Sequence, residues 1–419
     1  MTGRPEYSGS FLDKIVEGLL VLLPPAALLG PWAGSGRVFG YRILVVLLVG
    51  CAVTGWIYPI WVRRFSRAAC AIVVVAVAWA VTGVVGAMRL GPRRDLSSLM
   101  GAGLALAGAW SVARLISDRH IRRERALRDV AIGWAVAVWV GAPLAVWEIL
   151  TARHLGTYAD GAWRNHPGLY RQPATWLTNP NLYAVFLAVG SVWVGVVGVR
   201  SATRWVRIAV IATAVTGLGL LLATDSRIVY AALLLAVMVR LWAVRRWRWV
   251  LPGVVMVVVV VIVVTHLHQA GLVWHRFIGV LIHHNDEGPS SFAVRTTLLA
   301  WGLALVMEYP LLGAGPGGYR ANILAAPKRW FPHGKSDPHN GILEIASQYG
   351  LVVTALVAVC WCLAIGRCWR SRRWWGAALI TAMPVLSLAN STYLVQSVNQ
   401  LGWLVCVLAA SSSRQETPQ

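Results

Sequence analysis

Charged side chains are scarce in this sequence. Of its 419 residues only 13% are charged, while 58% are hydrophobic, and the mean hydropathy is +0.63. A soluble globular chain carries about 25% charged residues. The shortage of charge therefore excludes a soluble enzyme and a disordered scaffold.

Cysteine and lysine are also few, and a signal-peptide pattern is missing. The six cysteines lie in or beside apolar runs and none forms C-x-x-C, which predicts free, buried thiols rather than disulfides or metal ligands. Three lysines accompany 35 arginines, and the formal net charge is +22. Cytoplasmic loops of membrane proteins collect Lys and Arg, so this charge does not indicate nucleic-acid binding. Residues 1–10 are polar and lack signal-peptide features, so we expect the first apolar segment to be retained.

Long apolar runs are abundant. A membrane-spanning helix needs about 20 predominantly apolar residues. The runs predict an all-α polytopic membrane protein with about twelve transmembrane helices and both termini in the cytoplasm. The predicted spans cover residues 13–31, 38–61, 68–88, 96–116, 129–150, 176–199, 206–223, 226–243, 249–267, 340–366, 375–391 and 397–412.

A thirteenth apolar segment, 292–312, carries Arg295 near its start and Glu308 near its end. If it spanned the membrane, the arginine cluster 367–373 would move outside, against the positive-inside rule. We therefore predict that 292–312 is a helix lying in or near the outer interface. One cluster, Arg89 with Arg93 and Arg94, falls outside against the same rule, and nothing in the sequence accounts for it.

The spans divide the chain into three parts. Residues 1–267 hold helices one to nine, 268–339 form a long extracytoplasmic loop containing the interfacial helix, and 340–419 hold the last three helices and a cytoplasmic tail. Connections longer than about 15 residues are usually functional or disordered. The loop 268–339 is rich in aromatic residues, Gly and Pro, so we expect it to be functional.

Three ionisable residues near the outer face are candidates for chemistry, because such groups at membrane depth are functional by default. Arg227 opens a span after a very tight turn, which predicts burial near the bundle surface; the alternatives are snorkelling or pairing with Asp225. Arg295 begins the interfacial helix, where it could also anchor to headgroups. His339 precedes the tenth span, whose positive helix end disfavours imidazolium and favours a neutral base; the alternative is a capping role. Glu344 is a buried carboxylate for which a structural role is favoured.

A glycine-rich stretch, 313–319, follows the predicted interfacial helix. It lacks the Gly-Lys-Ser/Thr of a P-loop and no strand precedes it, so we interpret it as a tight turn whose N–H groups could meet an anion. With Arg320, Lys328, Arg329 and Lys335 it predicts a basic vestibule suited to phosphate, or to anionic headgroups.

Two further patterns are less decisive. Asn179-Pro180-Asn181 opens the sixth span, where it could cap the helix or contact substrate. Five histidines between 266 and 284 fit no standard ligand spacing, so no metal site is predicted.

Three segments of the sequence resemble the O-antigen ligase and O-antigen polymerase superfamily of bacterial envelope glycosyltransferases. The first is 179–184, the second is Ser226-Arg227, and the third runs from Arg295 through 309–315 to His339-Asn340, Glu344 and Gly350. The third is the most specific, because it keeps its order and spacing over about 55 residues. The resemblance covers roughly residues 170–370, and the twelve spans and long late outer loop agree with it.

The resemblance implies a GT-C-like membrane enzyme. Such an enzyme transfers a glycan from a polyprenyl diphosphate donor to a glycan, lipid or protein acceptor hydroxyl, on the outer face of the bacterial cytoplasmic membrane. The transfer is of the inverting type and uses no metal and no cofactor. Arg227 and Arg295 would neutralise the diphosphate and His339 would be the general base. Weaker candidates for substrate contact are Arg320, Arg171, Asn340 and Asn181.

Alternatives remain open at this point. Within the superfamily, the sequence does not separate a ligase from a polysaccharide polymerase. A solute carrier of the bicarbonate type is disfavoured because the halves show no internal repeat and the charges gather on one face rather than at the midplane. A non-catalytic partner in an envelope assembly would leave Arg227, Arg295 and His339 dispensable.

Overall fold

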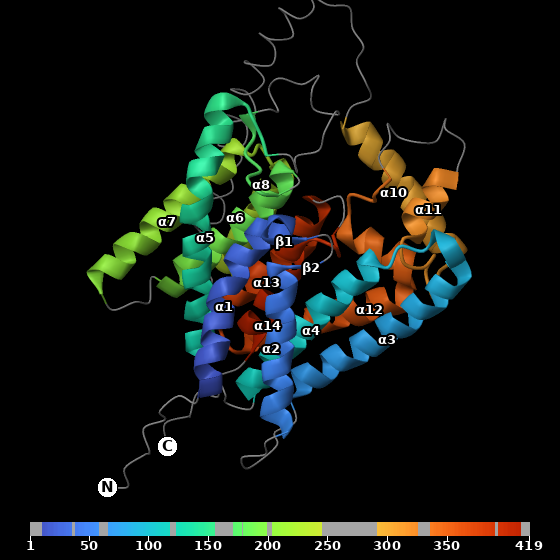
Figure 1. The fold of residues 1–419 in the computed structure, drawn as a ribbon, viewed down its shortest axis with the longest axis horizontal. Helices are drawn as coiled ribbons and strands as arrows, with labels where there is room; N and C mark the ends of the chain where they lie inside the picture. Colours follow the sequence, from blue (N-terminus) through green and yellow to red (C-terminus); the bar gives the residue numbers. More distant parts are fainter. Residues whose placement is uncertain are drawn as a thin grey trace, which may run out of the picture.

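The computed structural model shows an all-helical chain, with one short strand pair among the residues that it describes. Those residues are 11–35, 38–57, 66–117, 123–155, 171–177, 179–198, 203–244, 291–325, 336–389 and 393–411. The strands β1 (Gly34–Ser35) and β2 (Val38–Phe39) pair antiparallel between the first two long helices. The rest is helix and turn (Figure 1).

The helices follow the predicted spans closely in the described part of the chain. Seven segments are long and apolar enough to cross a membrane, which makes the chain a polytopic membrane protein. The predicted span 249–267 lies outside the described residues, so the count of twelve stays a prediction. The helices of the first two thirds are α1 (Phe11–Leu29), α2 (Gly40–Ile57), α3 (Arg67–Leu90), α4 (Ser97–Ser117), α5 (Arg123–Thr151), α6 (Pro180–Gly198), α7 (Arg204–Ala223) and α8 (Arg227–Ala243). The later helices are α10 (Ser291–Glu308), α11 (Gly318–Ala325), α12 (Gly341–Arg370), α13 (Trp374–Leu386) and α14 (Ser397–Ala410).

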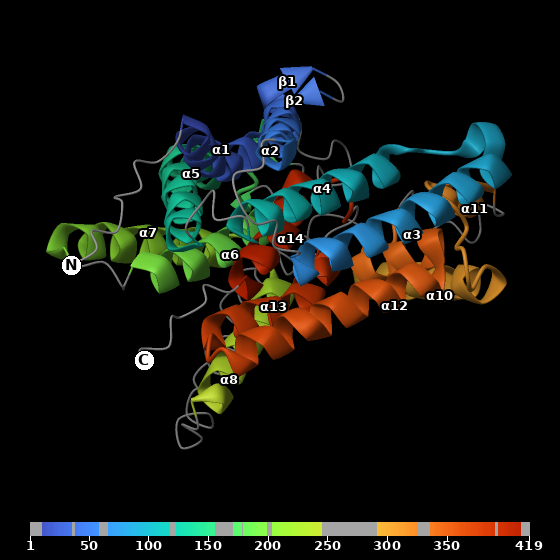
Figure 2. The ribbon, with the colours of Figure 1, turned by 90° about the horizontal axis from the view of Figure 1, so that it is seen from below.

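The long helices run up and down, so their ends gather at two ends of the bundle. Helices α3, α4 and α12 lie side by side, and α13 and α14 occupy the middle (Figures 1 and 2). At one end, Ser397 Oγ at the start of α14 donates to the Ala27 carbonyl near the end of α1, at 2.8 Å. At the other, Arg123 at the start of α5 donates to the Ala409 carbonyl near the end of α14. We call the first the site end and the second the basic end.

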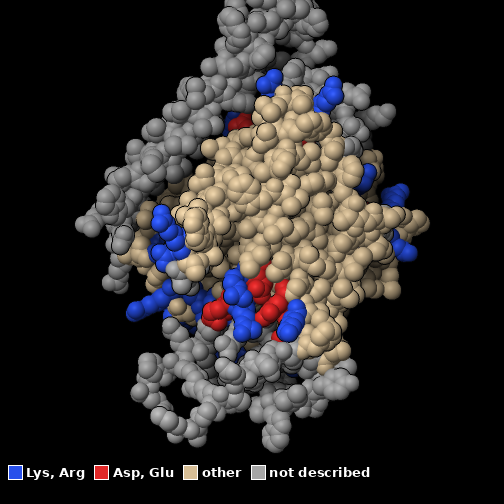
Figure 3. Space-filling view, turned by 60° about the vertical axis from the view of Figure 1, so that its left-hand side comes forward, with Lys and Arg blue, Asp and Glu red and all other residues tan. Residues whose placement is uncertain are grey.

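Charge is distributed as the sequence predicts for a membrane bundle. In Figure 3 uncharged side chains fill the middle of the face shown, and charged side chains lie around its edges. At the basic end, Arg125 of α5 pairs with Glu17 of α1 at 3.2 Å. The helix α3 exposes a run of valines, including Val73, Val74 and Val77, which suits contact with lipid.

The thiols are free, as predicted, but two of them are fully exposed. Cys51, Cys368 and Cys406 are buried and Cys360 is half-buried, whereas Cys70 and Cys362 are exposed. The prediction was wrong for these two because an apolar helix in a membrane protein can turn one face to lipid rather than to the core.

Helix α12 departs from the continuous span predicted over 340–366. Gly350 has φ 82° and ψ 173°, which interrupts the helix. The carbonyls of Ser347 and Gln348 accept hydrogen bonds from Ala314 N (2.7 Å) and Gly315 N (2.9 Å) instead. Irregular backbone within a membrane bundle is tolerated only where such partners exist. The turn 309–317 therefore supplies the hydrogen bonds that replace those lost at the break in α12.

Another correction concerns the predicted interfacial helix 292–312. The helix α10 ends at Glu308, and residues 309–312 form a turn that packs on the break in α12. Tyr309 N and Gly313 N still donate to the carbonyls four residues earlier, so the turn continues directly from the helix. The remainder of the predicted loop, 268–290 and 326–335, lies outside the described residues.

Candidate functional site

Arg227 is the first residue of α8, and its neighbours fix this helix end. Ser226, the N-cap of α8, is buried and donates through Oγ to Asn181 Oδ1 at 2.8 Å. Asn179 in turn accepts a hydrogen bond from Leu182 N at 2.9 Å, so it caps α6. Of the two readings of Asn179-Pro180-Asn181, capping is confirmed for Asn179, while Asn181 ties α6 to the start of α8.

The side chain of Arg227 is exposed rather than buried. The tight turn buries Thr224 and Ser226 instead. The prediction of burial was wrong because the first residue of a helix projects beyond the turn that precedes it. An exposed guanidinium is accessible to an anionic substrate.

Helices α8 and α13 set the level of Arg227 in the bundle. Arg240 near the end of α8 stacks over Trp375 at the start of α13, 5.4 Å from its ring centroid. Because α8 also packs along α13 and contacts η5, which follows α13, the two helices run antiparallel. Both rise about 1.5 Å per residue. Arg227 lies thirteen residues before Arg240 on α8, and Ser387 lies twelve residues after Trp375 at the end of α13. Arg227 is therefore level with Ser387, which opens the short helix η5 (Ser387–Ala389).

Gly341, the residue after His339 and Asn340, lies against the same short helix. Asn340 is the N-cap of α12, and its Oδ1 accepts from Ile342 N (3.0 Å) and Leu343 N (3.1 Å). A Cβ at the next residue, Gly341, would meet Ser387 Cβ at 2.9 Å. The cap is thus Asn340, which removes the capping role considered for His339. The half-buried His339 has φ 49°, a conformation uncommon outside glycine.

Arg295 lies on the face of α10 that meets α12. Gly302 is two turns further along α10, and a Cβ there would touch Leu343 of α12 at 2.4 Å. Leu311 packs on Gly350, so the two helices run in the same direction. Counting back seven residues from Leu343, as from Gly302 to Arg295, places Arg295 level with residue 336, three positions before His339. The half-buried Arg295 has its pKa lowered by desolvation, yet an arginine remains charged at neutral pH.

Three predicted residues therefore lie at the site end. Arg227 comes from α8, His339 from the segment before α12 and Arg295 from α10, and the short helix η5 contacts both α8 and α12. Arg320 is exposed and lies on α11, the helix that follows the turn packed on α12. Arg171 is also exposed, and the segment that follows it is held by Glu148 of α5, which accepts from Ala174 N and Thr175 N at 2.8 Å each.

Glu344 has the structural surroundings that the sequence favoured. It is 3% exposed, and its carboxylate accepts hydrogen bonds from Tyr393 N (2.6 Å) and Leu394 N (3.5 Å). These bonds fasten the segment before α14 to the first turn of α12. Glu344 therefore fixes the first turn of α12, which directly follows His339 and Asn340.

The glycine-rich turn does not offer its N–H groups to an anion, which corrects that prediction. Gly313, Ala314, Gly315 and Gly318 each donate to a backbone carbonyl, and Gly317 N donates to Gln348 Oε1 at 2.6 Å. Positive φ values at positions 313, 315 and 317 explain the glycines. The backbone N–H groups of the turn are therefore taken up by hydrogen bonds within the turn and to α12. Lys328, Arg329 and Lys335 of the predicted vestibule lie outside the described residues.

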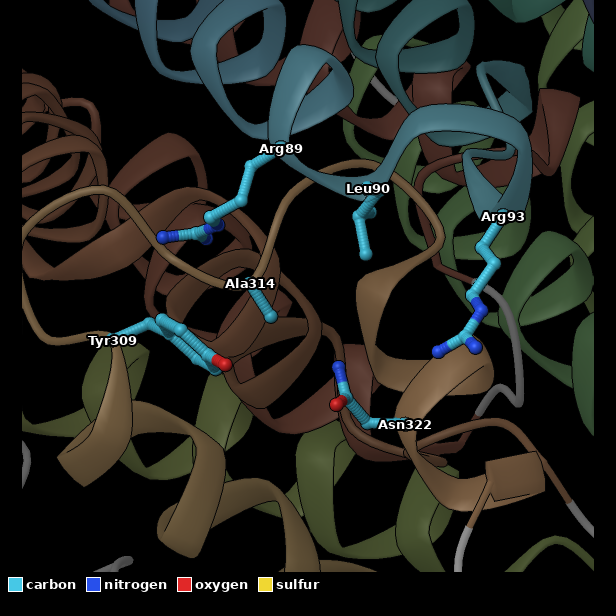
Figure 4. A pocket seen from close by; sticks show the side chains of 6 residues that line it. All are labelled: Arg89, Leu90, Arg93, Tyr309, Ala314 and Asn322. Carbon is cyan, nitrogen blue, oxygen red and sulfur yellow. The ribbon is translucent and has the colours of Figure 1, made fainter.

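A second feature of this end was missed by sequence reasoning. Arg89 donates to the Gly313 carbonyl, and its guanidinium carbon lies 4.3 Å from the Tyr309 ring centroid. With Arg93 it lines a cavity of about 310 Å³ (Figure 4). The sequence signal that could have indicated this cavity is the arginine cluster predicted outside the membrane. Arginines placed there against the positive-inside rule serve another purpose.

The described residues contain no group of three or more His, Cys, Asp or Glu that could hold a metal ion. The candidate residues at this end carry guanidinium, amide and imidazole groups. Guanidiniums match the geometry of phosphate oxygens, so the arrangement suits a phosphorylated substrate.

Comparison with known proteins gives one match. Residues 212–358 match the O-antigen ligase family. No curated protein matches the chain. The matched segment contains Arg227, Arg295, Arg320, His339 and Asn340, whereas Arg89, Arg171 and Asn181 lie outside it. The resemblance drawn from the sequence is thereby confirmed over residues 212–358, which are similar to the O-antigen ligase family.

Proposed function

We propose that this protein transfers a glycan from a polyprenyl diphosphate donor to an acceptor hydroxyl at the outer face of the bacterial cytoplasmic membrane. The family indicates glycan transfer in general. The observation that supports the finer proposal is the packing of the elements that bear the candidates: α8, which begins with Arg227, and α12, which follows His339, both contact η5, and α10, which carries Arg295, packs beside α12.

The proposed reaction is a single displacement at the anomeric carbon. The acceptor oxygen forms the new bond to that carbon while the bond to the diphosphate oxygen breaks, and the diphosphate leaves with the electron pair. His339 takes the proton of the acceptor hydroxyl, which typically contributes 10²–10⁴-fold. One displacement inverts the configuration, and the charge that develops on the diphosphate is met by guanidinium groups rather than by a metal ion.

The two arginines differ in their surroundings, which suggests different tasks. Arg227 is exposed at a helix start and can reach a mobile lipid-linked substrate, while the half-buried Arg295 sits on a packed helix face and is held in place. Preorganised charge aimed at a leaving group stabilises the transition state without reorganisation. We therefore assign diphosphate binding to both, with Arg295 as the more rigid partner.

The proposal predicts that Arg227→Ala lowers transfer by about 10²-fold or more, as removal of one preorganised donor does in other enzymes. The measurement is complementation in the native host at matched membrane levels, with extraction of polyprenyl-linked glycan. The variant should accumulate lipid-linked donor and lose surface glycan.

The matched control is Arg204→Ala. Arg204 is also an exposed arginine at the first position of a helix, α7, but at the basic end. It should behave as wild type. Products limited to single units would favour a polymerase, whereas full-length unattached chains would favour a ligase. If Arg227→Ala, Arg295→Ala and His339→Ala all behave as wild type, the chain is not this transferase, and a carrier or scaffold is favoured.

A further inference from the structure

A polar cavity lies beside the glycine-rich turn, on elements other than those that bear Arg227 and His339. Its lining comes from the end of α3, the short helix η2 (Gly91–Arg93), the turn after α10 and α11. In Figure 4, Arg89 extends toward Tyr309 on one side, while Arg93 reaches toward Asn322 on the other. Leu90 and Ala314 lie between these two pairs.

The two arginines of this cavity are not equivalent. Arg89 is engaged by the Gly313 carbonyl and the Tyr309 ring. Its side of the cavity also carries Glu308, whose hydrogen bond with the Tyr309 hydroxyl raises the pKa of Tyr309. Arg93 is exposed and makes no hydrogen bond or ion pair within the described part of the chain. One guanidinium is thus committed to packing and one is open to a ligand.

The other polar groups near Arg93 are already directed elsewhere. Asn322 Nδ2 donates to the Gly318 carbonyl at 2.7 Å, which fixes the amide on α11. The carboxylate of Asp95, two residues after Arg93, accepts from Ser97 N (2.9 Å) and Ser97 Oγ (2.6 Å). Two hydrogen bonds therefore direct the Asp95 carboxylate toward the start of α4. The positive charge of Arg93 is available to a ligand rather than to Asp95 or Asn322.

Exposed apolar side chains adjoin the residues that line the cavity. Met88 precedes Arg89 on α3 and is 75% exposed, and the turn contributes Leu311 and Leu312, which are 65% and 39% exposed. Below Met88, α3 exposes further valines, among them Val81, Val84 and Val85. A ligand held at Arg93 by its charged group would therefore find apolar surface for a hydrocarbon chain along α3.

We propose that this cavity binds the headgroup of an anionic membrane phospholipid, with the phosphodiester at Arg93 and an acyl chain along α3. One open guanidinium matches the single negative charge of a phosphodiester. A polyprenyl diphosphate carries a greater charge and would leave part of it uncompensated here. A zwitterionic lipid brings a cation that Arg93 repels. The volume, at the small end of ligand pockets, admits one headgroup rather than a glycan chain.

The test is native mass spectrometry of the full-length protein in detergent, titrated with phosphatidylglycerol. Wild type should bind one phosphatidylglycerol more tightly than phosphatidylcholine. Arg93→Ala should weaken that binding about tenfold, since a hydrogen-bonded charge is lost. Arg93→Lys keeps the positive charge but loses the paired N–H donors of the guanidinium, so it should give an intermediate affinity.

The control is Arg94→Ala, because Arg94 is the next residue, is also exposed and does not line the cavity. Its affinity should stay within twofold of wild type. Equal losses in Arg93→Ala and Arg94→Ala would overturn the proposal in favour of general attraction to anionic headgroups. Displacement of phosphatidylglycerol by equimolar polyprenyl phosphate would overturn it in favour of the polyprenyl lipid. Binding is read without glycan transfer, so failure here leaves the proposed function untouched.

Discussion

Replacement of His339 by asparagine is expected to lower glycan transfer by about 10²–10⁴-fold, the usual contribution of a positioned general base. Asparagine suits this position because His339 has φ 49°, and Asn tolerates the left-handed region better than most residues. The cap of α12 belongs to Asn340 and is unaffected. The loss should therefore be catalytic rather than structural.

The measurement is initial rate with purified lipid-linked donor and acceptor, together with the melting temperature of the protein in detergent. His339→Asn should melt within a few degrees of wild type and still bind donor. The matched control is Arg372→Asn, which places the same residue at another positive φ, 53°, at the basic end. A His339→Asn rate within tenfold of wild type would mean that another group takes the proton.

The His339→Asn variant probes a proposed site that the sequence located only in part. Arg227, Arg295 and His339 could be picked out because an ionisable residue beside an apolar span is rare and costly. Their common placement depends on contacts between distant segments, such as Arg240 with Trp375 and Gly341 with Ser387. No local pattern contains those pairs.

The helices themselves were predictable because an apolar run of sufficient length has few alternatives in a membrane. What local periodicity could not give was the break at Gly350 or the use of Arg89. Each arises where α3, the turn 309–317 and α12 meet, and each satisfies backbone groups of another segment. The glycines of the turn suggested anion binding, but their N–H groups serve this junction instead.

Replacement of Gly350 by alanine is expected to destabilise the protein strongly. With φ 82° and ψ 173°, Gly350 occupies a backbone region that is essentially restricted to glycine, which alone costs another residue about 1–3 kcal/mol. An added Cβ would also lie 2.1 Å from the Leu311 carbonyl oxygen, and displacing packed backbone costs about 1–3 kcal/mol more. Thermal unfolding in detergent, followed by loss of the monodisperse peak on size exclusion, measures the effect.

The same helix offers the control. Gly366 lies in a regular part of α12, and a Cβ there meets nothing within 4 Å. Gly366→Ala should therefore match or slightly exceed wild-type stability, because alanine is the better helix former. Equal melting temperatures for the two variants would show that the break at Gly350 is not needed for the fold.

The break also connects stability to the site. Leu351 N donates to the Pro310 carbonyl at 2.7 Å, and Ala314 N and Gly315 N bond to the carbonyls just before Gly350. These bonds fix the first two turns of α12 against the turn that ends α10. Because Leu343 of that segment packs on Gly302, a shift at Gly350 would move His339 relative to Arg295. Any Gly350→Ala protein that survives in the membrane should therefore lose more transfer activity than its remaining folded fraction accounts for.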